Sequence, residues 1–186
     1  MNPLKLILQM VVTLALSLPV IAVGDQTDQR LEDLFQTLRS SQDSTVLLEA
    51  ESSIWDIWYE SGQADIDALL EEAAALVSSG QLAAAESIYS RVIATAPNFS
   101  EGWNRRATVR YYRRDYTGSL DDIQQTLKLE PRHFGAIWGL GMILGSQRDY
   151  QRAILAFERL LEIKPNASDA RPRIELLKQE LAKQSV

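Results

Sequence analysis

The chain has no cysteine and only one histidine in 186 residues. Without cysteine it can form no disulfide and no thiolate metal site, and it has neither a cysteine nucleophile nor a bacterial lipid-anchor cysteine. No serine–histidine–aspartate or metal-ligand pattern surrounds the histidine, His133, so we expect it to cap a helix or pack at a loop. These observations predict no enzyme, no cofactor and no metal site. The rival hypothesis is an enzyme or enzyme subunit that uses His133 together with arginines.

The chain also lacks the basic excess of nucleic-acid-binding proteins, because its net charge is −6. We therefore expect no nucleic-acid partner. The charge is uneven along the chain: residues 25–99 hold 14 acidic and 3 basic side chains, whereas residues 100–186 hold 11 and 15. Two interpretations stay open. One is solvated helix faces of drifting composition, and the other is a bipolar surface that steers a charged partner or favours head-to-tail association.

The longest uncharged run lies at the N-terminus, from Leu6 to Val23, and it follows a single lysine, Lys5. Pro19 interrupts this run, and Ala22-Val23-Gly24 provides the small residues that signal peptidase recognises. Residues 1–24 are therefore predicted to be a secretory signal peptide, which would place the mature chain in the periplasm or outside a bacterial cell. The alternative is an uncleaved membrane anchor, since a run of about 18 residues is at the lower limit for spanning a bilayer. Only then would the chain contact a membrane.

No alternation of apolar and polar residues predicts a β-strand, whereas helical spacing recurs throughout the chain after residue 25. Three prolines, Pro97, Pro131 and Pro165, are each 34 residues from the next, and such a spacing indicates an internal repeat. Two helical stretches precede each proline and share small and large apolar positions. These positions hold Ala73, Ala107 and Gly141 in the first helix, and Ala85, Ser119 and Ala153 with Tyr89, Ile123 and Phe157 in the second.

This pattern resembles the tetratricopeptide repeat, over about residues 66–167. The resemblance implies an all-α fold in which three helix pairs form a right-handed superhelix. The pairs are expected at residues 66–99, 100–133 and 134–167. The resemblance also implies that the first helix of each pair lines a concave groove, where proteins of this family bind peptides or other proteins. The runs 101–107 and 130–136 are similar to those of small exported bacterial tetratricopeptide proteins, which have no settled biochemical role.

The segments on either side of the repeats are predicted to be caps. Residues 25–62 lack the small positions of the repeat and form an expected N-terminal helical pair. We expect its Trp55 and Trp58 to cover the exposed face of the first repeat, because a terminal unit must shield apolar surface. A tryptophan-rich binding patch is the alternative. Residues 168–186 are predicted to form a C-terminal capping helix, with Asp169 as its N-cap.

Five arginines lie on or directly after the first helix of the second repeat: Arg105, Arg106, Arg110, Arg113 and Arg114. Arg106 and Arg110 stand at packing positions that hold leucine and tyrosine in the family. One hypothesis pairs these two with acids of neighbouring helices. The candidate acids are Glu86, Asp121, Asp122 and Glu130. The other hypothesis is a groove that recognises anions, since arginine binds carboxylate and phosphate in a bidentate manner.

The residues predicted to bind a protein partner come from the first helices of the second and third repeats. They are Asn104, Arg105, Thr108, Tyr111, Tyr112, Trp138 and Met142. One sub-type of the family grips a C-terminal carboxylate with lysine and asparagine side chains. Its groove positions hold other residues here, namely Leu70, Ala74, Gly135 and Gly139, which argues against that sub-type.

Together these patterns predict a non-enzymatic adaptor of the cell envelope that binds a peptide or protein segment, acidic in character, in the groove of the repeats. Two alternatives remain open. The first is an assembly factor for an envelope complex, held to the membrane by an uncleaved N-terminus. The second is a structural protein that assembles with itself in a salt-sensitive manner, through its acidic and basic halves.

Overall fold

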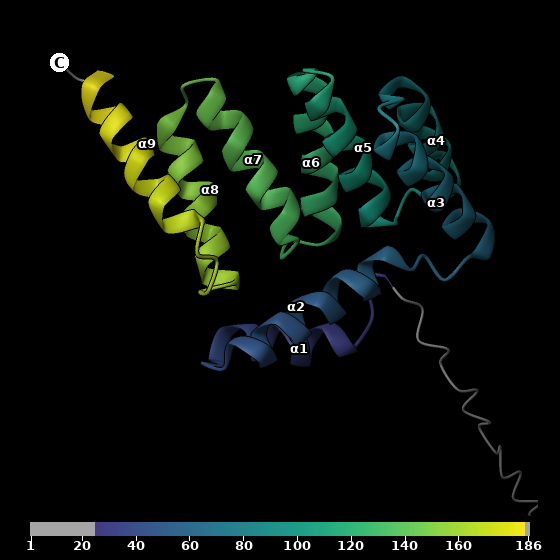
Figure 1. The fold of residues 1–186 in the computed structure, drawn as a ribbon, viewed down its shortest axis with the longest axis horizontal. Coiled ribbons are helices and arrows are strands. Elements are labelled where there is room, and N and C mark those ends of the chain that lie inside the picture. The colour runs from purple at the N-terminus through teal and green to yellow at the C-terminus, as the bar shows by residue number, and fades with distance from the viewer. Residues whose placement is uncertain (1–24, 185–186) are drawn as a thin grey trace, which may run out of the picture.

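The computed structural model describes residues 25–184 (Figure 1). Within these residues there are nine α-helices and no strand, so the expected all-α fold is confirmed. The helices are α1 Arg30–Ser40, α2 Ser44–Tyr59, α3 Ala64–Ser78, α4 Leu82–Thr95, α5 Ser100–Tyr112, α6 Tyr116–Leu129, α7 Phe134–Ser146, α8 Tyr150–Ile163 and α9 Ala170–Gln184. Three helical hairpins, α3–α4, α5–α6 and α7–α8, stack side by side, and α9 packs against α8 (Figure 1).

The turn inside each hairpin uses the same backbone conformation at positions 34 residues apart. Gly80, Arg114 and Arg148 have φ angles of 76°, 64° and 62°. Glycine adopts this left-handed conformation without strain, whereas for a residue with a Cβ the conformation costs about 1–2 kcal/mol of conformational energy. In the second and third hairpins the next residue is an aspartate, Asp115 or Asp149, whose carboxylate caps the following helix. The cap stabilises the turn that the arginine strains.

The second and third hairpins fill the same space in different ways. In the second, Ala107 and Ile123 belong to one buried apolar cluster. In the third, the equivalent residues are Gly141 and Phe157. A Cβ at Gly141 would lie 2.6–2.9 Å from three ring atoms of Phe157, so the larger ring occupies the volume that the missing methyl group leaves. The smaller residue at position 141 therefore makes room for the larger one at position 157, as close packing of a core requires.

The N-terminal helix pair, α1 and α2, does not cover the first repeat, so that expectation is wrong. The pair lies along one edge of the array, beneath α5 to α8, and shares an apolar core with α7, α8 and α9 (Figure 1). Trp55 and Trp58 pack on His133 and Phe134, where α7 begins. Trp55 comes so close that a Cβ at Gly135 would lie 2.7 Å from its Cη2 atom.

The first repeat leaves no large apolar side chain fully exposed, although the N-terminal pair does not cover it. In the described part of the chain, the exposed large apolar residues belong to α2, α5, α8 and α9, and none to α3 or α4. Ala68, Ala75 and Ala83 are exposed there instead. An exposed alanine leaves little apolar area in water, so covering this end would stabilise the fold only slightly.

Polar contacts connect the N-terminal segment to all three proline-containing loops. They join Gln26 to Asn98 and Ser100, Glu32 to Arg132, and Glu51 to Lys164. The amide of Gln26 also replaces a missing cap, because its Oε1 accepts the N–H of Ser100 at 3.0 Å where α5 begins. The edge of the array that the prolines mark is therefore the edge along which the N-terminal helix pair is held.

The predicted signal peptide, residues 1–24, lies outside the described residues, and its cleavage stays a prediction. Among residues 25–184 no helix has both the length and the apolar character needed to cross a membrane.

Gly141→Ala should destabilise the protein by about 1–3 kcal/mol, because the added methyl group overlaps the ring of Phe157 in a packed core. This loss opposes the gain of about 1 kcal/mol that alanine has over glycine in a helix. Adding Phe157→Ile recreates the Ala107–Ile123 pair and should recover most of the stability. Urea denaturation of both single variants and the double variant measures the coupling. A double variant less stable than Gly141→Ala alone would contradict the interpretation that Phe157 fills the space left by Gly141.

Candidate functional site

A pocket of about 210 Å³ lies between α5 and α7, on the face formed by the first helices of the hairpins, and residues of α6 line its floor. Six of the seven residues predicted to bind a partner line it. They are Asn104, Thr108, Tyr111, Tyr112, Trp138 and Met142. The structure thus brings these side chains together around one hollow, and their role in binding stays a prediction.

The depth of the pocket comes from a missing side chain. Gly139 lies on α7 in the wall of the pocket, and a Cβ there would make only an ordinary contact, 3.4 Å from Ile123. Trp138 is held beside it by an edge-to-face contact with Phe157, with the ring centroids 5.0 Å apart. Tyr112 forms the outer rim and is 60% exposed. The pocket therefore combines a packed indole, a glycine in its wall and an exposed tyrosine at its rim.

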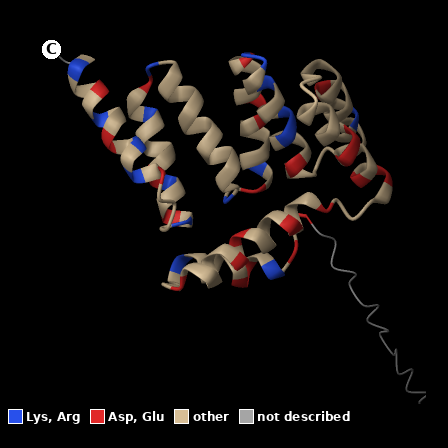
Figure 2. Ribbon diagram, viewed as in Figure 1, with Lys and Arg blue, Asp and Glu red and all other residues tan. Residues whose placement is uncertain are grey.

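None of the residues that line this pocket is charged. Helix α7 has no charged side chain along its whole length (Figure 2). Two polar groups in the wall are already bonded within the protein: the Asn104 amide donates to Glu101 at 2.8 Å, and the Thr108 hydroxyl donates to the carbonyl of Asn104 at 3.0 Å. The pocket offers an uncharged surface that includes three aromatic side chains, and such a surface does not suit an anion.

Arg105, the seventh predicted residue, does not line this pocket. Its Nε donates to Glu101 at 2.5 Å, and its guanidinium lies over the ring of Tyr59, 4.2 Å from the centroid. Burial opposes the charge of Arg105, but the Glu101 carboxylate, together with Tyr59 and Tyr89, raises the pKa of the guanidinium above its usual value. Arg105 instead lines a neighbouring pocket between α3 and α5, where Glu60 and Glu71 also lie. The one arginine among the predicted binding residues is thus surrounded by acids of its own chain.

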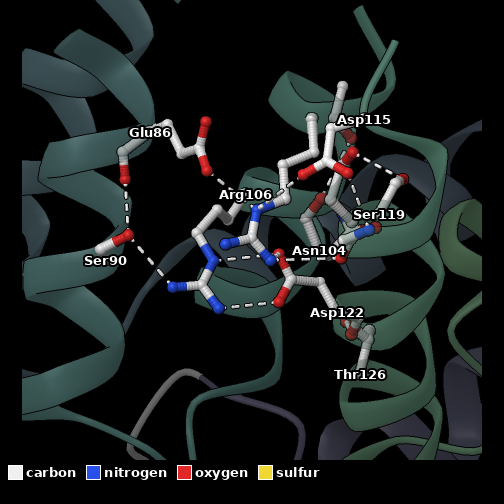
Figure 3. Close-up of polar contacts among 12 residues, drawn as sticks. Glu86, Ser90, Asn104, Arg106, Asp115, Ser119, Asp122 and Thr126 are labelled. Atoms are coloured by element: carbon white, nitrogen blue, oxygen red, sulfur yellow. Dashed lines mark hydrogen bonds and ion pairs between the residues drawn. The ribbon is translucent and has the colours of Figure 1, made fainter. Parts of the chain in front are cut away.

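Arg106 and Arg110 lie in the interface between α4, α5 and α6, and Figure 3 shows Arg106 between Ser90 and Asp122. Arg106 donates to both carboxylate oxygens of Asp122, at 2.9 and 2.7 Å. Arg110 donates to the same carboxylate at 3.0 Å and to Glu86 at 2.9 Å. Asp122 is only 1% exposed. The hypothesis of internal pairing is confirmed for these two acids, and neither arginine is left to recognise an anion in the groove.

Sequence reasoning missed a buried polar centre formed by Glu101 and His133, which are 1% and 0% exposed. His133 Nε2 lies 3.0 Å from Glu101, and its Nδ1 accepts the N–H of Ala136 at 3.2 Å, so the ring caps α7 as expected. Its face stacks on Trp58, with the centroids 4.1 Å apart. The two residues are 32 positions apart and belong to no local motif, so the sequence held no signal for their contact. Among the described residues, no group of histidine and acidic side chains is arranged to hold a metal ion.

Asp122→Asn is expected to destabilise the protein by about 3 kcal/mol, because it leaves two arginines without their shared buried carboxylate. Asp121→Asn is the matched control, since its side chain is the next along α6 and is exposed. That change should alter stability by less than about 0.5 kcal/mol. Urea denaturation compares the two variants, and equal effects would mean that the network does not stabilise the fold.

A family model described as the tetratricopeptide repeat matches residues 104–168. A TPR repeat-containing protein of Rhizobium etli is 34% identical over 154 residues, which cover 83% of this chain and 76% of the relative. The first TPR domain of Spaghetti, solved with an HSP90 peptide, has a TM-score of 0.61 at 20% identity, covering 63% of this chain and 93% of that one. The MamA protein has a TM-score of 0.60 at 18% identity, covering 82% and 81%. The two solved structures share the fold, and the relative and the family model show that this chain belongs to the tetratricopeptide repeat family.

Proposed function

We propose that this protein is a non-enzymatic adaptor that binds a peptide segment of a protein partner in its groove. The segment inserts one apolar or aromatic side chain into the pocket between α5 and α7. The observation that carries this proposal is the uncharged pocket in which six of the predicted residues, three of them aromatic, meet.

The size of the pocket supports a side chain as its occupant. Pockets that take whole small molecules typically enclose roughly 300–1,000 Å³, whereas this one encloses about 210 Å³. Trp138 and the tyrosines provide ring faces and edges, which pack well against another ring or an aliphatic chain. Tryptophan and tyrosine side chains are also frequent anchors at protein interfaces.

The charge of the pocket argues for a different ligand chemistry from that of one structural neighbour. The peptide bound to the Spaghetti domain, SRMEEVD, carries three acidic residues. Arg105, Arg106 and Arg110 are all paired with acids of this chain. The pocket between α5 and α7 therefore selects an uncharged side chain, in contrast to the acidic segment that the sequence predicts for this groove.

The cell envelope is the proposed location of this adaptor, and the proposal rests on the signal-peptide pattern of residues 1–24. The rival is an assembly factor that keeps those residues as a membrane anchor. The mass of the mature protein separates the two, since loss of residues 1–24 excludes the anchor.

Gly139→Leu is expected to block partner capture, because its side chain would extend from the wall into the pocket. Gly139→Ala is the matched control: its methyl group makes only an ordinary contact, and alanine should stabilise the helix by about 1 kcal/mol. A photo-cross-linking residue at Thr108, on the pocket wall, would report capture from a native envelope extract. We expect the alanine variant to retain the cross-linked partner and the leucine variant to lose at least about tenfold. Equal yields with both variants would exclude the pocket as the binding site.

A further inference from the structure

We propose a second interaction surface on the opposite face of the array, where a groove between α6 and α8 takes an acidic amphipathic helix of a partner protein. The groove encloses about 660 Å³ and shares with the first pocket only Ile123, whose side chain lies between the two. An adaptor needs two surfaces to bring two partners together, and this groove is independent of the one proposed above.

The two walls of the groove carry matching stripes at helical spacing. On α6, the lining residues include Leu120, Ile123, Gln124 and Leu127, and on α8 they are Arg152, Leu155, Ala156 and Arg159, so the two apolar residues of α8 lie between two arginines. Residues at i, i+3, i+4 and i+7 lie on one face of a helix, so each wall presents a continuous strip. A helix laid between two such strips would bury its own apolar face, which is a recurring mode of peptide recognition.

Leu155 is the least expected residue in this groove, because it is 58% exposed on a helix whose buried side is already apolar. The repeat allows a comparison within the chain itself. The positions 34 and 68 residues before Leu155 hold Asp121 and Ser87, which are polar and exposed. The scaffold thus does not require a leucine at this position, and an apolar partner surface gives the exposed side chain a role.

The charge of the groove indicates which helix would fit. Its lining includes Lys128, Arg152 and Arg159 but no carboxylate. Asp149 pairs with Arg152 at one end. Arg159 donates to the carbonyl of Pro131, a contact that leaves its charge uncompensated. Lys128 and Arg159 are then the cations that acidic residues beside the apolar face of a partner helix would meet, and such complementarity selects one sign of charge over the other.

Selection from a phage-displayed library of helical peptides, each about four turns long, tests this proposal on the full chain. We expect enriched peptides to carry apolar residues at i, i+3, i+4 and i+7 with aspartate or glutamate beside them. Leu155→Glu should weaken their binding at least about tenfold without altering the melting temperature, because the side chain is exposed. Leu176→Glu, at an exposed leucine on α9, is the matched control and should change affinity by less than about twofold.

Fluorescence anisotropy then measures the affinity of the enriched peptides for the protein and its variants. Affinity should fall as salt rises, since the rim contacts are exposed ion pairs. Gly139→Leu should leave the affinity for these peptides unchanged. This result distinguishes a failure of the proposed groove between α6 and α8 from a failure of the pocket between α5 and α7. Basic or neutral peptides, no enrichment, or equal binding to Leu155→Glu would overturn the proposal. If the protein forms a dimer in sedimentation and Leu155→Glu dissociates it, the occupant of the groove is a second copy of this chain and not an acidic helix of another protein.

Discussion

The contact on which the rest of the structure depends is the stack of Trp58 on His133. Because Nδ1 of the imidazole accepts the N–H of Ala136, the ring proton lies on Nε2 and is donated to Glu101. One ring thus joins the N-terminal helix pair, the start of α7 and the first turn of α5. The indole N–H of Trp58 finds no partner among the described residues, so ring stacking and burial rather than a polar bond hold it there.

This centre positions the groove that we propose to be functional. Glu101 accepts bonds from Asn104 and Arg105 as well as from His133, so its carboxylate sets the start of α5 relative to that of α7. The pocket lies between these two helices, a few residues further along each. A rigid hollow for a partner side chain requires that the two helices keep their separation. The buried polar centre and the packed tryptophans provide that rigidity without placing any charge in the pocket.

The three prolines and the small positions at 34-residue spacing predict the helical hairpins, and the resemblance to the tetratricopeptide repeat points to the helix face on which six of the seven predicted residues line one pocket. Such features are local, because helical periodicity and repeat register decide which face each residue takes. The partners of the arginines and the position of the N-terminal pair could not be predicted in the same way. They depend on contacts between distant segments, such as Arg110 with Glu86 and Trp58 with His133. The many alanines of the first repeat were the available sign that it would leave little apolar surface for a cap to cover.

Native-state hydrogen exchange of Trp58→Ala would test most directly whether one contact connects the N-terminal pair to the groove. The account predicts that the amides of α1 and α2 lose protection together with those in the first turns of α5 and α7, while the far ends of α5 and α7 keep theirs. Loss of protection confined to α1 and α2 would contradict it, because the groove would then be independent of the helices packed along its edge.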